Sequence, residues 1–246
     1  MNIEDELHLS YRFGNMPINY FPFPHFYCEN VFSNHFYKKI QENLPEEKFL
    51  FPISEKRPVP KESYKQRFVL SLEDQDLLKL PNADFWSTFK NQMLGSGLKH
   101  FLISRFSDIL NNLHPNFKNY KTWSEILIVK DKENYALGPH TDHPTKLITI
   151  LFYFPVDNSE ENIGTSIYMP KDFKFTCPGG PHHKKEEFNL IYTAPFKSNS
   201  AFGFVKTNNS FHGVEKVNTT SYRWLLLYDI YFEEMNSDKA NTSFSF

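Results

Sequence analysis

The sequence predicts an α+β protein that is mainly β, with helices supporting an antiparallel β core. The helical patterns fall before Pro115, and the chain then changes to short aromatic and β-branched runs separated by Pro, Gly, Asn and Asp. Helices first and strands later are typical of the α+β class, and short strands in this number favour a sandwich, jelly roll or barrel. We therefore expect a single domain over 1–246, with mostly helical support in 1–115, the β core in 116–232 and a polar tail in 233–246.

Two elements are predicted near the start of the chain. Pro22 and Pro24 punctuate the aromatic stretch "FPFPHFYCENVF", which indicates an edge strand or an extended entry segment. The next stretch, "SNHFYKKIQENLP", predicts a helix that begins after Ser33 as N-cap and closes at Pro45. Apolar residues recur on one face of this helix: Phe36, Ile40 and Leu44.

A loop and a long helical pattern follow. The Pro-rich stretch 52–61, with the charged residues around it, is interpreted as a solvated loop. The pattern over 84–115 has apolar residues at helical spacing, and Asp84 is a candidate N-cap. Because Gly95 and Gly97 weaken its middle, it is expected to divide into two helices.

Six runs in the second half are expected to be strands, since each is short, apolar and bounded by turn residues. They cover residues 123–131, 146–154, 164–170, 188–196, 199–207 and 222–232.

Composition excludes several classes of protein. A formal charge of −2 argues against a nucleic-acid binder, which would carry a basic field. Two cysteines form no disulfide framework and suit a reducing compartment. The acidic start "MNIEDELHLS" lacks the features of a signal peptide, and no apolar run is long enough to span a membrane. A cytoplasmic protein with no nucleic-acid or membrane partner is expected, and its oligomeric state is left open.

The stretch "GPHTDHP" places ionisable groups at the edge of an apolar strand. If it begins as a strand, His140 and Asp142 share one face and can supply two adjacent metal ligands, whereas His143 points away and is expected to have a structural role. By itself this pattern is a weak signal for which a polar turn is the simpler interpretation, and a third ligand must come from another part of the chain.

A second stretch, "SFHGVEKVNTTSYRWLLLYDI", supplies that ligand. It contains His212, and Arg223 opens the strand that follows. The polar turn between them suggests that the two flanks are adjacent antiparallel strands. Two His and one carboxylate form the ligand set of non-haem Fe(II) oxygenases, and an Arg can hold a carboxylate through two hydrogen bonds.

With His140-x-Asp142, His212 and Arg223 identified, the sequence resembles the Fe(II)/2-oxoglutarate-dependent dioxygenases, in particular their prolyl-hydroxylase-like branch. The stretches "TILFYFP" and "GTSIYMP" and the aromatic opening add to the resemblance, which covers roughly residues 22–232. It implies a double-stranded β-helix (jelly roll), Fe(II) held by the three ligands, and 2-oxoglutarate and O2 as cosubstrates. It also implies that Arg223 pairs with the distal carboxylate of 2-oxoglutarate, and that a C–H bond is hydroxylated with release of succinate and CO2. Family members that halogenate lack the carboxylate ligand, so Asp142 favours hydroxylation.

The strand "LITILFYF" offers two further candidates. Thr149 and Tyr153 share a face that is expected to look into the barrel, while the wholly apolar opposite face packs on the helices. The family often places a tyrosine of this strand against 2-oxoglutarate, which makes Tyr153, with Thr149, a candidate cofactor-binding residue. A core tyrosine with a local partner is the alternative.

The loop 171–188 is the longest connection in the predicted core. It is interpreted either as a passive connector or as a lid over the active site in which His182 or His183 contacts the substrate. A zinc site with Cys177 would need ligands that are not nearby. Arg67 could reach an acidic substrate, although a surface salt bridge is the simpler interpretation.

Two function classes remain open. The first is a 2-oxoglutarate-dependent hydroxylase acting on a small-molecule or peptidyl substrate of unknown identity. The second is a non-redox cupin-like isomerase or metal-binding module. Arg223 discriminates between them, since a cupin-like isomerase needs no anchor for a dicarboxylate. A family member that has lost catalysis and serves as a scaffold is disfavoured by the intact set of ligands.

Overall fold

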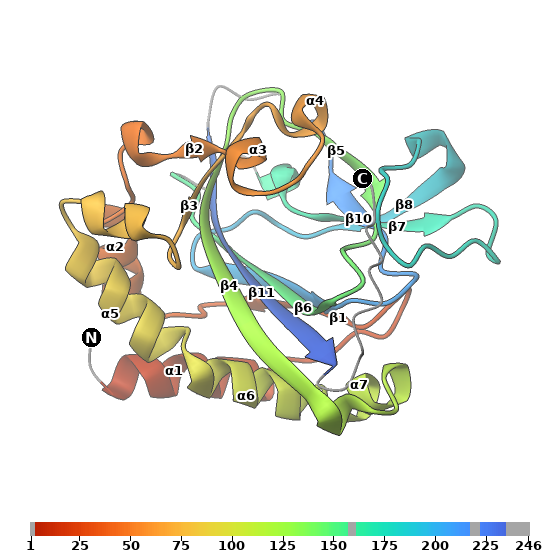
Figure 1. The fold of residues 1–246 in the computed structure, drawn as a ribbon, viewed down its shortest axis with the longest axis horizontal. Helices are drawn as coiled ribbons and strands as arrows, with labels where there is room; N and C mark the ends of the chain where they lie inside the picture. The colour runs from red at the N-terminus through yellow and green to blue at the C-terminus, as the bar shows by residue number, and fades with distance from the viewer. Residues whose placement is uncertain (1–2, 157–160, 217–221, 235–246) are drawn as a thin grey trace.

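The computed structural model describes residues 3–156, 161–216 and 222–234, and all its strand pairs are antiparallel. A seven-stranded sheet has the order β1-β9-β6-β11-β4-β3-β2, and a four-stranded sheet has the order β5-β10-β7-β8 (Figure 1). The strands of the large sheet are β1 (His25–Glu29), β2 (Phe51–Pro52), β3 (Arg67–Ser71), β4 (Tyr120–Asp131), β6 (Lys146–Tyr153), β9 (Ser200–Val205) and β11 (Arg223–Glu234). Those of the small sheet are β5 (Leu137–His140), β7 (Ser166–Pro170), β8 (Phe188–Thr193) and β10 (His212–Val214).

The eight strands from β4 to β11 pass back and forth between the two sheets. Strands β4, β6, β9 and β11 are neighbours in the large sheet, and β5, β7, β8 and β10 make up the small one. This winding is that of a double-stranded β-helix, so the predicted jelly-roll core is confirmed. The predicted edge strand is confirmed as β1, which closes one end of the large sheet.

Helices cover the outer face of the large sheet. The α-helices are α1 (Ile3–Asn15), α2 (Asn34–Glu42), α3 (Ile53–Lys56), α4 (Lys61–Tyr64), α5 (Ala83–Met93), α6 (Ser96–Arg105) and α7 (Ser107–Leu113). In Figure 1, α1, α2, α5 and α6 lie on the far side of the large sheet from the small sheet, while α3 and α4 lie over the open end between the sheets. The 3-10 turns are Glu47–Phe49, Gln75–Lys79, Phe117–Asn119, Glu161–Ile163 and Lys185–Glu187.

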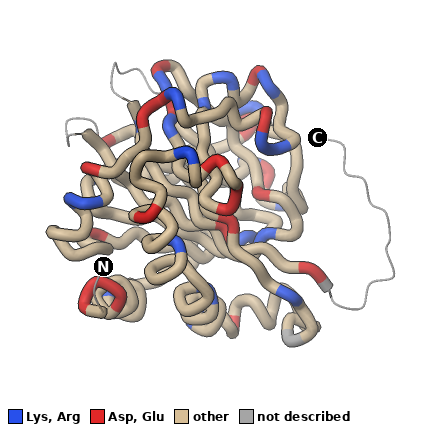
Figure 2. The backbone as a smooth tube through the Cα atoms, turned by 60° about the vertical axis from the view of Figure 1, so that its left-hand side comes forward, with Lys and Arg blue, Asp and Glu red and all other residues tan. Residues whose placement is uncertain are grey.

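Strand β6 shows how alternation divides the core in two. Ile148, Ile150 and Phe152 belong to the cluster between the large sheet and the helices, whereas Leu151 and Tyr153 belong to the cluster between the sheets. The predicted division of this strand into a helix-facing and a barrel-facing side is therefore correct from Ile148 onward, whereas Leu147, predicted on the barrel side, belongs to the helix-side cluster. Figure 2 shows acidic and basic residues interspersed along the chain, without a face of one sign in that view.

The helical half contains both correct and incorrect predictions. Ser33 caps α2 as predicted, because its hydroxyl accepts a hydrogen bond from the Phe36 N–H at 3.2 Å. The long pattern does break at Gly95, but a further break at Phe106 makes three helices, and Asp84 lies inside the first turn rather than at the cap. The stretch 52–61 is not a continuous loop, since Ile53 is buried and begins α3.

Two other expectations are corrected by the sheets. Strand β10 does not pair with β11: β10 pairs with β5 and β7, while β11 pairs with β4 and β6. The chain therefore passes from the small sheet to the large sheet between β10 and β11. Strand β11 also extends to Glu234, two residues into the predicted tail, and 235–246 lie outside the described residues. Within the described ranges, no helix is both long and apolar enough to cross a membrane.

Asn199 ties the β1–α2 connection to the start of β9. Its buried side chain accepts a hydrogen bond from the Phe32 N–H at 2.9 Å and donates one to the Phe32 carbonyl at 2.8 Å, and its own φ is 56°. We predict that Asn199→Ala lowers the free energy of unfolding by about 2–4 kcal/mol, since it leaves both Phe32 groups without that partner. Asn199→Gly should cost about 1 kcal/mol less, because glycine accepts a positive φ. Urea denaturation measures both; equal stability of Asn199→Ala and wild type would contradict the prediction.

Candidate metal centre

His140, Asp142 and His212 meet between the two sheets. Each offers one ligand atom, and these atoms all lie within 4.8 Å of one another. His140 and His212 come together because β5 and β10 are paired with these two residues in register. Strand β5 ends at His140, so Asp142 reaches the site from the following loop and not from the same strand face, as the sequence had suggested. Among the described residues, this is the single group of three or more His, Cys, Asp or Glu with such spacing.

Backbone carbonyls orient both imidazoles. Nδ1 of His140 lies 3.0 Å from the Gly138 carbonyl oxygen, and Nδ1 of His212 lies 3.0 Å from the Ser210 carbonyl oxygen. A carbonyl accepts only from a protonated nitrogen, so Nε2 of each ring keeps its lone pair for a metal. Burial lowers the pKa of both histidines, which keeps both rings neutral.

Asp142 is held by two polar side chains. The Thr149 hydroxyl lies 2.8 Å from Oδ2, and the Lys146 ammonium lies 3.3 Å from Oδ1. Burial alone would raise the pKa of Asp142, but the Lys146 ammonium, together with the Thr149 hydrogen bond, outweighs it and holds this pKa below its usual range. Oδ1 is also 3.9 Å from Nε2 of His212, so it is the carboxylate oxygen that faces the other ligands.

A buried network continues from Lys146 along the wall of the site. Lys146 also contacts Asp229 at 2.9 Å, and Arg57 lies 3.4 Å from the same carboxylate. Arg57 pairs further with both carboxylate oxygens of Glu125, to which the Tyr231 hydroxyl donates. Sequence reasoning missed this network. The one available signal was Asp229, a lone acidic residue in the apolar run "RWLLLYDIYF".

A small inner chamber of about 80 Å³ leads from the three ligands into the barrel. Its inner part is lined by Leu137, Leu151, Thr165, Val214, Leu227 and Arg67. Arg67 is 7% exposed and pairs with Asp131 through two contacts of 2.6 and 2.8 Å. Arg67 therefore does form a salt bridge, but the expected surface location is wrong, because the Arg67–Asp131 pair is buried beside the chamber.

Arg223 lies behind this pair. It is fully buried, and its guanidinium donates to Asp131 at 2.6 Å and to the Ile163 carbonyl at 2.6 Å, with Thr165 at 3.4 Å. Asp131 thus lies between two guanidinium groups. Among the described residues, no second acidic side chain forms an ion pair with either of them. One positive charge is therefore left over at the inner end of the chamber.

The other sequence candidates occupy different places. Thr149 lines the chamber beside Asp142 and also lies 2.9 Å from Asp229. Tyr153 is buried near Arg223, and its hydroxyl donates to Thr165 at 2.9 Å, which is the local partner expected of a core tyrosine. His143 lies beside the triad with Nδ1 2.8 Å from the Thr145 hydroxyl.

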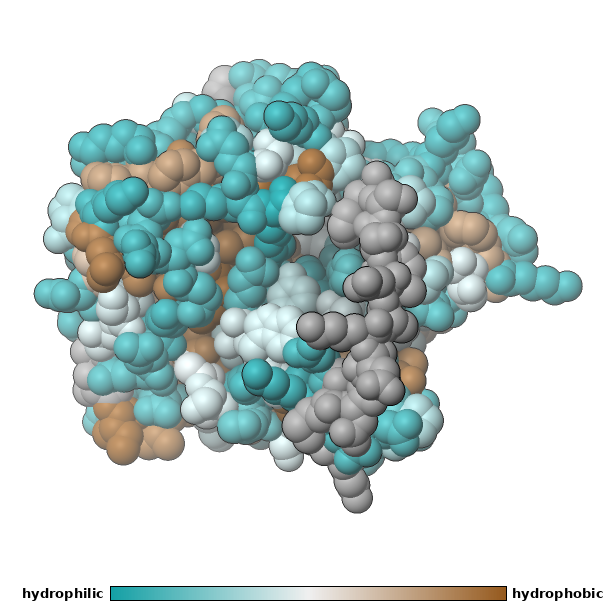
Figure 3. All heavy atoms as spheres, viewed as in Figure 1, coloured by the Kyte–Doolittle hydropathy of each residue, from teal (hydrophilic) through white to brown (hydrophobic). Residues whose placement is uncertain are grey.

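An outer cleft of about 800 Å³ opens on the other side of the three ligands. It meets the inner chamber at His140, Asp142, Lys146, Arg57, Val59 and Tyr64, which line both. Figure 3 shows the surface hollowed near the centre of the face viewed there. The volume is within the range of small-molecule sites, about 300–1,000 Å³.

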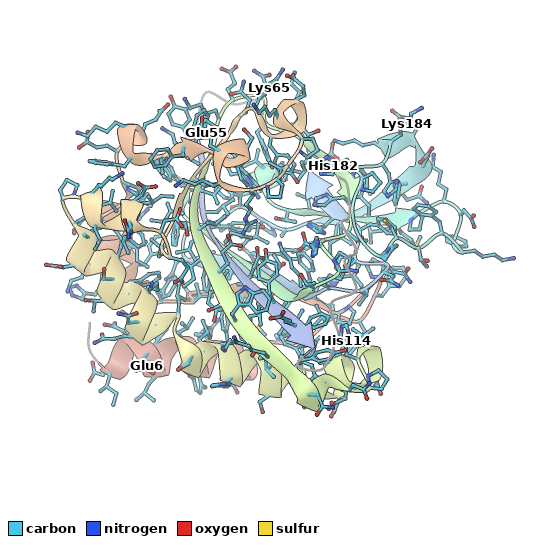
Figure 4. All side chains as sticks on the ribbon, viewed as in Figure 1. Glu6, Glu55, Lys65, His114, His182 and Lys184 are labelled. Atoms are coloured by element: carbon cyan, nitrogen blue, oxygen red, sulfur yellow. The ribbon has the colours of Figure 1, made fainter. Side chains whose placement is uncertain are left out.

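The loop 171–188 reaches the cleft through Gly180, Pro181 and His182. In Figure 4, His182 lies between α4 and the short strands β5 and β10. Its ring centroid is 4.7 Å from that of His140, and its Nε2 is 3.2 Å from the Tyr64 hydroxyl. His183 instead packs against Phe175 and Phe211, away from the cleft. Of the two loop histidines proposed to contact substrate, His182 is the one at the cleft.

Searches by sequence give no relatives: no family model matches the chain, and no curated protein matches it. Solved structures do match over most of its length. A 2OG-Fe(II) oxygenase family oxidoreductase from Burkholderia pseudomallei is 12% identical, with 94% of this chain and 91% of that one covered and a TM-score of 0.47. A prolyl 4-hydroxylase from Phytophthora capsici is 15% identical, with coverage of 87% and 60% and a TM-score of 0.47. The α-ketoglutarate-dependent carbocyclase SnoK from nogalamycin biosynthesis is 11% identical, with coverage of 94% and 84% and a TM-score of 0.49.

Proposed function

We propose that this protein is an Fe(II)- and 2-oxoglutarate-dependent oxygenase that hydroxylates an unactivated C–H bond. The observation that carries the proposal is a chamber with two different ends. One end offers two neutral imidazoles and a carboxylate, and the other holds one positive charge that no described acidic residue balances. An iron-bound dicarboxylate complements both ends.

The metal end suits Fe(II). His140, Asp142 and His212 would hold the ion, and three protein ligands leave positions for a cosubstrate and O2. Bound iron would supply the redox chemistry in which 2-oxoglutarate is oxidised to succinate and CO2 and a C–H bond of the substrate is hydroxylated. Thr149 and Lys146 fix the orientation of Asp142, so the carboxylate is already in place before the metal arrives.

The inner end suits the distal carboxylate of 2-oxoglutarate. Arg67 and Thr165 line the chamber, whereas Arg223 contributes its charge from behind Asp131. A buried charge without a counter-ion is costly, and a ligand carboxylate would remove that cost. We therefore assign the anchor to the Arg67–Asp131–Arg223 group as a unit, in place of Arg223 alone. The apolar residues between the two ends exclude water from the space that the cosubstrate would fill.

The experiment for this function is cosubstrate turnover. Fe(II)-loaded protein should convert 2-oxoglutarate to succinate and CO2, slowly when alone and faster with a hydroxylatable compound. The cupin-like alternative predicts no succinate with any metal. Measuring succinate by mass spectrometry, with a metal-free sample as control, separates the two classes.

The loop gives a separate prediction. Changing Pro181 and His182 to Ser-Gly keeps the anchors of the loop, because Thr141 donates to the Cys177 carbonyl and Lys206 to the Pro178 carbonyl. If the loop is a lid that holds the substrate, succinate should still form but its coupling to hydroxylation should fall at least about tenfold. The control is Lys184→Ala, which changes an exposed residue of the same loop. Unchanged coupling in the loop variant would mean that the loop is a passive connector.

A further inference from the structure

Among the described residues, each Arg, Lys, Asp or Glu that lines the outer cleft forms an ion pair with another side chain. Arg57 pairs with Glu125 and Asp229, Lys146 pairs with Asp142 and Asp229, and Glu73 at the rim pairs with Lys90 at 3.0 Å. His182, which also lines the cleft, has its Nε2 3.2 Å from the Tyr64 hydroxyl. This arrangement differs from the inner end of the chamber, where one positive charge is left over.

Bound iron and cosubstrate would keep the cleft neutral. The ion-pair network beside the metal site holds three carboxylates, Asp142, Asp229 and Glu125, against two cations, Lys146 and Arg57. Fe(II) would add two positive charges, and one carboxylate of 2-oxoglutarate would add one negative charge. The charges of this network would then balance before any substrate enters.

The cleft also presents a flat aromatic wall. Trp123 and Tyr231 are stacked with ring centroids 5.7 Å apart and planes within 11° of parallel. Trp123 lines the cleft and is 41% exposed, so part of this indole is available to a ligand. Pro58, Val59 and Pro60 supply apolar surface elsewhere in the cleft. Aromatic side chains of this kind favour flat apolar rings through offset stacking.

We propose that the substrate is an uncharged, ring-bearing small molecule whose ring packs against Trp123. The proposal rests on the proposed function, and it names the substrate class of the same site. A charged substrate would have to break one of these ion pairs or leave its own charge unpaired beside them, which is costly. A neutral ring requires neither.

Three naphthalene probes that differ only in charge test the proposal. They are 2-naphthol, which is neutral at pH 7, 2-naphthoate, an anion, and 2-naphthylmethylammonium, a cation. Dissociation constants are measured by anaerobic calorimetry, both on the protein alone and on protein loaded with Fe(II) and 2-oxoglutarate. We expect 2-naphthol to bind at least about tenfold more tightly than either charged probe in the loaded protein, and Trp123→Ala to weaken its binding about tenfold.

Glu125→Gln tests whether the ion pair of Arg57 disfavours charged ligands in the cleft. This change keeps the size of the side chain but leaves the charge of Arg57 under-balanced, so binding of 2-naphthoate relative to 2-naphthol should rise at least about fivefold. Glu47→Gln is the matched control, since it alters the net charge equally at a surface pair with Lys130 and Lys132 outside the cleft.

The probe titrations on the wild type decide whether the cleft prefers a neutral ring. Equal or tighter binding of a charged probe by the wild type overturns the proposal, and so does the absence of binding by all three probes. If Glu125→Gln does not fold, the three probes on the wild type still decide. Binding of Fe(II) and 2-oxoglutarate is measured separately, so failure of the proposed function is recognised by its own titration and not by the probes.

Discussion

Replacing Asp142 with Ala is expected to abolish stoichiometric Fe(II) binding and, with it, all conversion of 2-oxoglutarate. Asp142 is the only acidic side chain in the group of described residues that can act as ligands, and two imidazoles alone do not offset the cost of dehydrating the ion. Loss of residues that only orient ligands typically costs 10–100-fold in affinity, so loss of the anionic ligand itself should exceed about 100-fold. Anaerobic titration with Fe(II) measures the change.

Asp172→Ala is the matched control, because it removes an exposed carboxylate at the start of the 171–188 loop. It should bind Fe(II) as the wild type does. If Asp142→Ala retained a site of wild-type affinity, the metal would lie elsewhere in the chain. Far-UV circular dichroism of both variants checks that the fold is intact, since Asp142 also pairs with the buried Lys146.

The second large effect concerns the charge at the inner end of the chamber. Arg223→Met should weaken 2-oxoglutarate binding more than tenfold while Fe(II) binding stays within about twofold. The two guanidinium groups would become one, which Asp131 neutralises, so the ligand carboxylate would lose a charge-assisted interaction of about 1.5–3 kcal/mol. Arg67→Met should have at least as large an effect, because Arg67 lines the chamber directly. Arg223→Lys should be intermediate, since it keeps the charge but loses the forked geometry.

A second substitution separates charge from geometry. Adding Asp131→Asn to Arg223→Met restores one positive charge, now carried by Arg67 alone, and should recover much of the lost affinity for 2-oxoglutarate. Calorimetry at saturating Fe(II) measures all four variants under anaerobic conditions. If Arg223→Met binds 2-oxoglutarate as the wild type does, the anchor lies elsewhere. If the double variant does not recover affinity for 2-oxoglutarate, loss of net positive charge is not the cause of the weaker binding.

The sequence predicted those features that depend on local pattern. The alternation in "LITILFYF" gave the two faces of β6, and the Ser33 cap gave the start of α2. His140, Asp142 and His212 could be selected because their residue types match one ligand set, and the structure brings them together.

The features that the sequence did not predict depend on contacts between distant segments. Arg67 and Asp131 are 64 residues apart, and Arg223 and Asp131 are 92 apart, so no local pattern indicates that they share one buried group. Arg223 could be chosen as a candidate anchor from its place in the sequence. Asp131, whose carboxylate lies between Arg223 and Arg67, could not be identified in that way. The sheet assignment of β10 failed because a short polar turn is compatible both with a hairpin and with a crossing between sheets.

The central claim is that the His140, Asp142 and His212 site binds iron and 2-oxoglutarate together. Its most direct test is an anaerobic titration of metal-free protein, first with Fe(II) and then with 2-oxoglutarate, in which visible absorption is recorded. The account predicts one Fe(II) per chain and, on addition of one equivalent of 2-oxoglutarate, a visible charge-transfer band that does not form with succinate or with Asp142→Ala. Absence of stoichiometric Fe(II) binding, or of any spectral change with 2-oxoglutarate, would contradict it.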